Sequence, residues 1–197
     1  MADLMNKFDI FDELNNNLKK VIKSFYVFSD EKGYNVLFVT IDDLVFGFGS
    51  NDCGVCGLGH EMVVNEPQVV DELCHKGVKQ FYNGYQFALA LTNDNNIYGW
   101  GNNEHGQLGK GYTNLNKIFK PNLINGLNEE IIEMSCGSAH SLVLTSDGVV
   151  YGWGGNTYGQ IGGGRGMDDK VSVITQLNGL PKVKSLFIRY IIWGDRQ

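Results

Sequence analysis

The stretch VYGWGGNTYGQIGGG at residues 150–164 decides the fold, because two other stretches of the chain match it without gaps. They are VFGFGSNDCGVCGLG at 45–59 and IYGWGNNEHGQLGKG at 97–111. Successive copies lie 52 and 53 residues apart. A match of this length at a nearly fixed period identifies an internal repeat, which is the sequence signature of a repeat architecture.

Each repeat has the pattern of short β-strands joined by tight turns. Phe87–Thr92 is a short apolar run, and the turn-forming residues Asn93–Asn96 follow it. At the matching place in the next repeat, Asp147-Gly148 is a strong hairpin signal. Four short strands in a period of about 50 residues indicate one blade of a β-propeller. We therefore expect strands near 87–92, 97–101, 140–145 and 150–154.

These patterns predict an all-β fold, a partial β-propeller of about three four-stranded blades with an N-terminal amphipathic helix. The expected boundaries are an N-terminal helix at 1–24, a repeat body at 25–181 divided at about 26–77, 78–130 and 131–182, and a tail at 183–197. Within the tail, Val183–Leu186 matches the opening strand of a fourth repeat, and the rest diverges.

The N-terminal helix is predicted near residues 8–24 from its apolar spacing. Phe8, Phe11, Leu14 and Leu18 recur at intervals of three or four residues and place one apolar stripe on a helix. The stripe has two interpretations. It packs onto the first blade, or it binds a partner protein.

The repeat motif itself consists of glycines and large apolar residues at matching positions. Glycine allows neighbouring backbones to approach closely, and the aromatic residue between two glycines supplies buried volume. We expect Trp100 and Trp153 to be core residues. The motif residues are Gly47, Gly49, Gly99, Trp100, Gly101, Gly106, Leu108, Gly109, Gly137, His140, Gly152, Trp153, Gly154, Gly159, Ile161 and Gly162.

Composition excludes several classes of function. The chain has 197 residues, of which 43% are hydrophobic and 19% charged, so it can form a sizeable core. Its 26 glycines and only 3 prolines fit many tight turns. The net charge of −6, with no Lys/Arg run, argues against direct binding to nucleic acid or to an anionic membrane. Four cysteines are ordinary for a reducing compartment, so we expect a cytoplasmic or nuclear location.

One cysteine pair could carry chemistry. Cys53-Gly54-Val55-Cys56 has the spacing of half a zinc site or of a redox pair. In the repeat alignment, however, Cys56 takes the place of Leu108 and Ile161, which favours a buried apolar role for this thiol. We therefore expect no metal site.

Two other motifs resemble catalytic or cofactor sites only superficially. His140 precedes Ser141, but the matching residues of the other repeats include no His-Ser pair, so we expect a histidine hydrogen-bonded within its blade. Gly162–Gly166 lacks the Lys-Ser/Thr of a phosphate-binding loop. We expect neither catalytic residues nor a cofactor, and therefore no enzyme.

The run CGSAHSLVLTSDGVVYGWGGNTYGQIG at 136–162 resembles the repeat of the regulator of chromosome condensation family. The resemblance covers about Phe25 to Pro181 and implies a propeller, usually of seven blades. The layout is most similar to the start of the branch that joins this propeller to BTB domains. The fourth repeat departs from the pattern at Arg189, where a glycine should stand. We therefore expect the chain to be the front part of a longer protein.

The resemblance implies a non-enzymatic scaffold whose loops bind a protein partner, as in BTB-linked ubiquitin-ligase adaptors. The alternative is guanine-nucleotide exchange on the small GTPase Ran, and no exchange residue can be matched to this sequence. The partner would then be a ubiquitin-ligase component or a small GTPase. In the glycine-rich loops, the candidate contact residues are Asp52, Glu104, His105, Thr157 and Tyr158. The neighbours Glu104 and Gln107 suggest that His105 faces solvent.

The expected incompleteness of the ring has a physical consequence. A propeller removes its sheet edges by closing, and three blades of seven cannot close. Apolar tail residues, among them Ile188 and Trp193, would then lie on an open edge. We expect the isolated chain to be an open three-blade arc that is poorly soluble or oligomeric.

Overall fold

The computed structural model describes residues 5, 7–12, 14–30, 33–111, 116–162 and 168–186. The tail from residue 187 onward, including Arg189 and the apolar residues expected on an open edge, lies outside the described residues. The chain divides into two compact units, Met1–Glu104 with Asn114–Ile124, and His105–Thr113 with Asn125–Gln197. No helix in the described part is long and apolar enough to cross a membrane.

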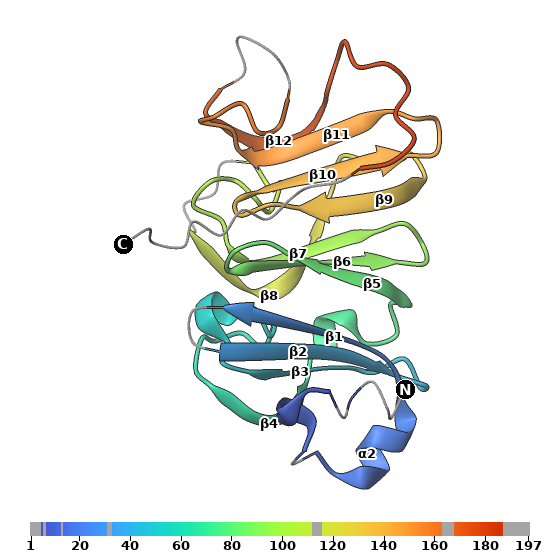
Figure 1. Cartoon of the computed structure of the whole chain (residues 1–197), viewed down its shortest axis with the longest axis vertical. Helices are drawn as coiled ribbons and strands as arrows, with labels where there is room; N and C mark the ends of the chain where they lie inside the picture. The colour runs from blue at the N-terminus through green and yellow to red at the C-terminus, as the bar shows by residue number, and fades with distance from the viewer. Residues whose placement is uncertain are drawn as a thin grey trace. The chain divides into compact units, whose positions relative to one another are not determined.

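The described residues form three four-stranded antiparallel sheets, as predicted (Figure 1). We call them blades one, two and three. Blade one contains β1 (Ile22–Asp30), β2 (Gly33–Thr40), β3 (Val45–Gly49) and β4 (Val64–Val69). Blade two contains β5 (Val78–Asn83), β6 (Phe87–Thr92), β7 (Ile97–Asn102) and β8 (Lys117–Ile124). Blade three contains β9 (Ile131–Cys136), β10 (His140–Thr145), β11 (Val150–Gly155) and β12 (Lys170–Gln176).

The predicted strands near 87–92, 97–101, 140–145 and 150–154 are confirmed to within one residue at each end. All six residues of β6 are buried, because both faces of this sheet are covered. In each of these hairpin turns, a threonine forms hydrogen bonds to the turn through its backbone and its hydroxyl. The hydroxyls of Thr92 and Thr145 donate to the carbonyls of Asn96 and Val149 at 3.4 and 2.9 Å.

The structure corrects the predicted N-terminal helix. Instead of one helix near residues 8–24, there is a single 3-10 turn, η1 (Asp9–Phe11), followed by a short helix, α2 (Asn16–Val21). The Asn15 side chain accepts a hydrogen bond from the backbone N–H of Asn17 at 2.8 Å and so starts a new helix at this point. Ile22 already belongs to β1, where it pairs with Thr40.

The apolar residues of the N-terminal segment nevertheless pack onto blade one, which is the first of the two interpretations. Phe11 and Leu14 belong to the same buried cluster as Phe38 and Phe48 of blade one. The ring centroids of Phe11 and Phe48 lie 6.2 Å apart in an edge-to-face arrangement. The N-terminal segment thus covers one face of this sheet.

The prediction of a strand at Val183–Leu186 is wrong, because these residues form no strand in the structure. The segment contacts blade three through single hydrogen bonds instead. The backbone N–H of Val183 donates to the Gly148 carbonyl at 3.1 Å, and that of Leu186 donates to Glu133 Oε2 at 2.7 Å. A strand needs a neighbour along its whole length, and the described residues offer none here.

Candidate functional site: the glycine-rich loops

A glycine-rich loop follows the third strand of every blade, and a buried asparagine organises it. Asn51 and Asn156 are 0% and 6% exposed and occupy the same position in their repeats. Their Oδ1 atoms accept hydrogen bonds from the backbone N–H groups of Cys56 and Ile161 at 2.9 and 3.1 Å. Each asparagine therefore holds its loop together from within.

Two of these loops are locked by the tryptophan of the following blade. Trp100 Nε1 donates to the carbonyl of Val55 at 2.7 Å, and Trp153 Nε1 donates to the carbonyl of Gln107 at 2.8 Å. Val55 and Gln107 occupy the same position in their loops. Both tryptophans are 0% exposed, as predicted. A buried indole N–H needs an acceptor, and the preceding loop provides it.

The same two loops also pair with the fourth strand of the following blade. The backbone N–H of Gly59 donates to the carbonyl of Phe119 in β8 at 3.0 Å, and that of Gly111 donates to the carbonyl of Ser172 in β12 at 2.7 Å. An added Cβ at Gly106 would lie only 2.8 Å from the Cα of Ser172. Glycine is required there because the two backbones are in direct contact.

The side chains at the tips of the loops are exposed in the second and third repeats. Glu104, His105 and Thr157 are exposed, and Tyr158 is 93% exposed, which is unusual for an aromatic side chain. Among the predicted contact residues, Asp52 is different, because it is only 8% exposed and its Oδ2 accepts a hydrogen bond from Gln86 Nε2 at 2.9 Å. Asp52 is therefore not part of the exposed loop surface.

Gln107 also corrects a detail of the sequence interpretation. The polar neighbours of His105 suggested that it faces solvent, and His105 is exposed, but Gln107 itself is only 1% exposed. Its Oε1 accepts a hydrogen bond from the backbone N–H of His105 at 2.9 Å, which shapes the tip from inside the loop. Gln160 does the same for Tyr158 in the third repeat, at 2.9 Å.

The cysteine pair lies inside the first loop. Cys56 is 0% exposed and fills the site that Leu108 and Ile161 fill in the other repeats, as predicted. Burial raises the pKa of the Cys53 thiol above its ordinary value, which disfavours the thiolate needed for metal binding or redox chemistry. Among the described residues, no group of three or more His, Cys, Asp or Glu side chains is placed to hold a metal ion.

His140 and Ser141 do not form a nucleophile–base pair. They are neighbours on β10, so their side chains point to opposite faces of the sheet. Ser141 is fully buried, and its hydroxyl lies 3.7 Å from the sulfur of Cys136. Burial lowers the pKa of His140, because it disfavours the charged imidazolium.

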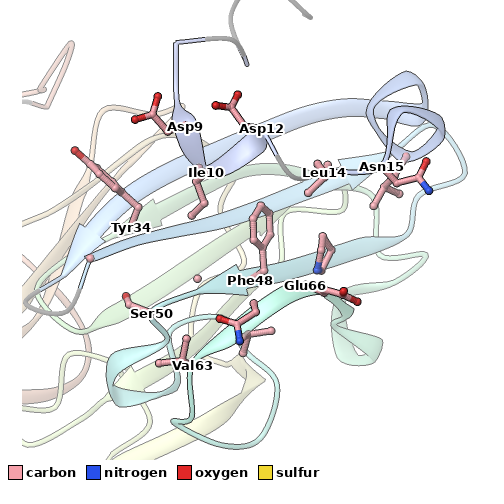
Figure 2. Close-up of a pocket in the computed structure, with 16 residues that line it drawn as sticks. Asp9, Ile10, Asp12, Leu14, Asn15, Tyr34, Phe48, Ser50, Val63 and Glu66 are labelled. Atoms are coloured by element: carbon pink, nitrogen blue, oxygen red, sulfur yellow. The ribbon is translucent and has the colours of Figure 1, made fainter.

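A cavity beside blade one was not predicted from the sequence. It has a volume of about 850 Å3 and lies between the N-terminal segment, the end of β3 and the start of β4 (Figure 2). Asp9, Asp12 and Leu14 line it from the N-terminal segment, and Phe48 and Asn65 line it from the blade. No sequence motif marks this cavity, because residues from four separate segments of the chain form it.

The three four-stranded sheets, with glycine-rich loops hydrogen-bonded to the following blade, are typical of a β-propeller repeat protein. The model of the regulator of chromosome condensation (RCC1) repeat matches residues 42–91 and 94–144, and a second RCC1 repeat model matches residues 78–107 and 131–160. The chain belongs to the RCC1 repeat family. The first matched repeat begins before β3 and ends in β6, so one sequence repeat joins two consecutive blades.

Curated relatives and solved structures agree with this assignment. The chain is 37% identical to the human E3 ubiquitin-protein ligase HERC2 over 129 residues, which cover 65% of this chain and 3% of that protein. It is 43% identical to the zebrafish Protein RCC2 homolog over 99 residues, 49% of this chain and 20% of that protein. Yeast RCC1 (Prp20), solved bound to Kap60, superposes with a TM-score of 0.67 at 25% identity over 81% of this chain and 38% of that one.

Proposed function

We propose that this chain is a non-enzymatic protein-interaction module that binds a partner protein through the tips of its glycine-rich loops. The observation that carries the proposal is the contrast within each loop. The asparagine and the glycines recur in all three loops, and a tryptophan binds the carbonyl of the first two. The tip residues, in contrast, differ between repeats and are exposed in repeats two and three. A rigid scaffold with variable exposed tips is a common arrangement for recognition.

Tyr158 is the strongest single candidate for a contact residue. Its side chain is 93% exposed, and its loop is fixed by Asn156 and Gln160. Exposed tyrosines on rigid loops offer a large amphipathic contact surface that loses little conformational entropy on binding. The neighbouring Thr157 adds a hydroxyl that can donate and accept hydrogen bonds.

The finer proposal is that the partner belongs to a ubiquitin-ligase system, as for the BTB-linked branch of the family. The relatives named E3 ubiquitin-protein ligases support this direction. This chain spans 3–13% of the length of such relatives, so their activity is proposed here only as the context of the module. Exchange activity on Ran is the alternative, and a nucleotide-release assay on Ran distinguishes the two.

Removing the four exposed tip side chains is expected to weaken partner binding by at least about tenfold, since each central contact residue contributes on the order of 1 kcal/mol or more. The variant combines Glu104→Ala, His105→Ala, Thr157→Ala and Tyr158→Ala. Binding is measured by quantitative affinity capture from lysate with isotope-labelled wild-type chain as reference.

The matched control is Ile41→Ala, which truncates a side chain that is 65% exposed in the β2–β3 turn, outside the glycine-rich loops. This variant should retain the wild-type set of captured proteins. Equal capture by the tip variant and the wild type would contradict the proposal. Recovery of ubiquitin-ligase subunits that depends on the tips would support the finer proposal.

A further inference from the structure

The dipeptide Asn-Gly occurs three times in the chain, at residues 83–84, 125–126 and 178–179. At such a pair, the backbone nitrogen of the glycine can attack the side-chain amide carbon of the asparagine. Glycine favours this ring closure, because it has no Cβ to hinder the approach and its backbone is conformationally permissive. The structure places the three pairs in different surroundings, and these surroundings determine which pair can react.

The first pair is held in place by hydrogen bonds. Asn83 Oδ1 accepts a hydrogen bond from the hydroxyl of Tyr26 at 2.7 Å, and Asn83 Nδ2 donates to the carbonyl of Gly84 at 3.0 Å. The backbone N–H of Gly84 donates to the carbonyl of Phe87 at 3.1 Å. Asn83 is also the last residue of β5, where it pairs with Ala88. Its amide carbon can therefore reach the Gly84 nitrogen only after local opening.

The other two pairs are accessible. The pair 125–126 is exposed between β8 and β9, and the pair 178–179 is exposed just after β12. No described residue forms a hydrogen bond with the side chain of Asn125 or Asn178, or with the N–H of the glycine that follows. Gly126 and Gly179 have positive φ values, +115° and +81°, outside any strand or helix. The nitrogen and the amide carbon are thus free to approach each other.

The two accessible pairs occupy the same position of the repeat, 53 residues apart. When the repeats are matched by the pairing of β3 with β4 and of β7 with β8, Asp71 is the corresponding residue of blade one. Asp71 begins the 3-10 turn η3 (Asp71–Leu73). An aspartate at this position is therefore compatible with the fold of a blade.

We propose that Asn125 and Asn178 are sites of spontaneous deamidation and that the fold protects Asn83. The glycine nitrogen forms a bond to the asparagine Cγ, the Cγ–Nδ2 bond breaks, and Nδ2 leaves as ammonia with the proton of the glycine N–H. Water then opens the cyclic imide. Cleavage of the bond between Cγ and the nitrogen gives aspartate, and cleavage of the bond between the main-chain carbonyl carbon and the nitrogen gives isoaspartate.

The reaction changes both the charge and the backbone of the chain. Each event adds one negative charge to the formal net charge of −6. An isoaspartate product also inserts the side-chain methylene into the main chain and so lengthens the connection after the fourth strand. The proposal goes beyond the proposed function, because the reactant is water and the site is the chain's own backbone.

The test is a time course of the folded chain at mildly alkaline pH, with peptide mapping by mass spectrometry to give the deamidated fraction at each asparagine. Asn125 and Asn178 should react at least about tenfold faster than Asn83, because several hydrogen bonds must open before Asn83 can react. In denaturant, the three sites should react at similar rates. Equal rates at the three sites of the folded chain would overturn the proposal, as would a difference that persists in denaturant.

Two variants test the causes separately. Tyr26→Phe removes the hydrogen bond to Asn83 Oδ1 and should raise the rate at Asn83 severalfold without changing that at Asn125. Gly179→Ala should slow the reaction at Asn178 by about tenfold, because its Cβ hinders ring closure, and Asn125 serves as the internal control. An unchanged rate at Asn178 in this variant would contradict the proposed chemistry. None of these results depends on the capture of a partner, so the proposed function is tested separately.

Discussion

Replacing Trp153 by alanine is expected to lower the free energy of unfolding by about 3–5 kcal/mol, as large core truncations do. The indole is 0% exposed and donates from Nε1 to the carbonyl of Gln107 at 2.8 Å. The substitution therefore creates a cavity in blade three and removes the indole hydrogen bond to a carbonyl of the second loop. Chemical denaturation followed by circular dichroism measures the loss.

Trp153→Phe separates the two contributions. It keeps most of the buried ring and removes only the N–H, so the expected loss is about 1–3 kcal/mol. A loss below about 0.5 kcal/mol for Trp153→Ala would mean that the residue does not belong to the repeated core.

Replacing Gly101 by alanine is expected to destabilise the chain by about 2–5 kcal/mol, from backbone strain and overpacking together. Gly101 has a φ of +100°, and its added Cβ would lie 2.5 Å from the carbonyl oxygen of Gln86 and 2.7 Å from the Cα of Phe87. Both contacts are with backbone at the start of β6, which cannot move without disturbing the β6–β7 pairing.

Gly179→Ala is the control for the backbone contribution. Its φ of +81° is also unfavourable for alanine, but in the described part of the chain the new Cβ would meet no atom within 4 Å. We expect a loss of about 1–2 kcal/mol, the cost of the left-handed conformation alone. If the two variants have the same thermal midpoint, the close approach at Gly101 does not constrain the sheet.

The strands could be predicted because the repeat supplies each pattern more than once. Phe87–Thr92 alone is a short apolar run, which does not distinguish a strand from a buried helix segment. The matching segment His140–Thr145 is followed by Asp147-Gly148, a strong hairpin turn. The alignment therefore indicates a hairpin at both places. The burial of Trp100 and Trp153 follows from the same alignment.

The N-terminal segment could not be predicted in the same way, because it occurs once. The apolar spacing from Phe8 to Phe25 fits a single helix. However, Asn15 caps a new helix in the middle of this segment, and Ile22 belongs to β1, where it pairs with Thr40. Strand pairing with β2 outweighs the local helical pattern. The sequence alone does not contain the information on this tertiary competition.

The loop residues differ in how well their exposure could be predicted, because some of their side chains bind residues far away in the sequence. The exposure of Tyr158 agrees with its position at a loop tip, whereas Asp52 is buried because Gln86, 34 residues away, binds its carboxylate. The structural role of Asn51 and Asn156 was missed, although both begin the same loop motif. Their recurrence in every repeat, with Asn103 as the third member, was the available signal.

We attribute the rigidity of the first two glycine-rich loops to the tryptophan of the following blade, whose indole N–H binds a carbonyl of each loop. Hydrogen exchange at the indole N–H groups of Trp100 and Trp153 tests it directly, because each donates to a loop carbonyl at 2.7–2.8 Å. We predict that both indole protons exchange more slowly than those of a free indole by several orders of magnitude, at a rate governed by opening of the structure. Exchange at the free-indole rate at either tryptophan would contradict the account.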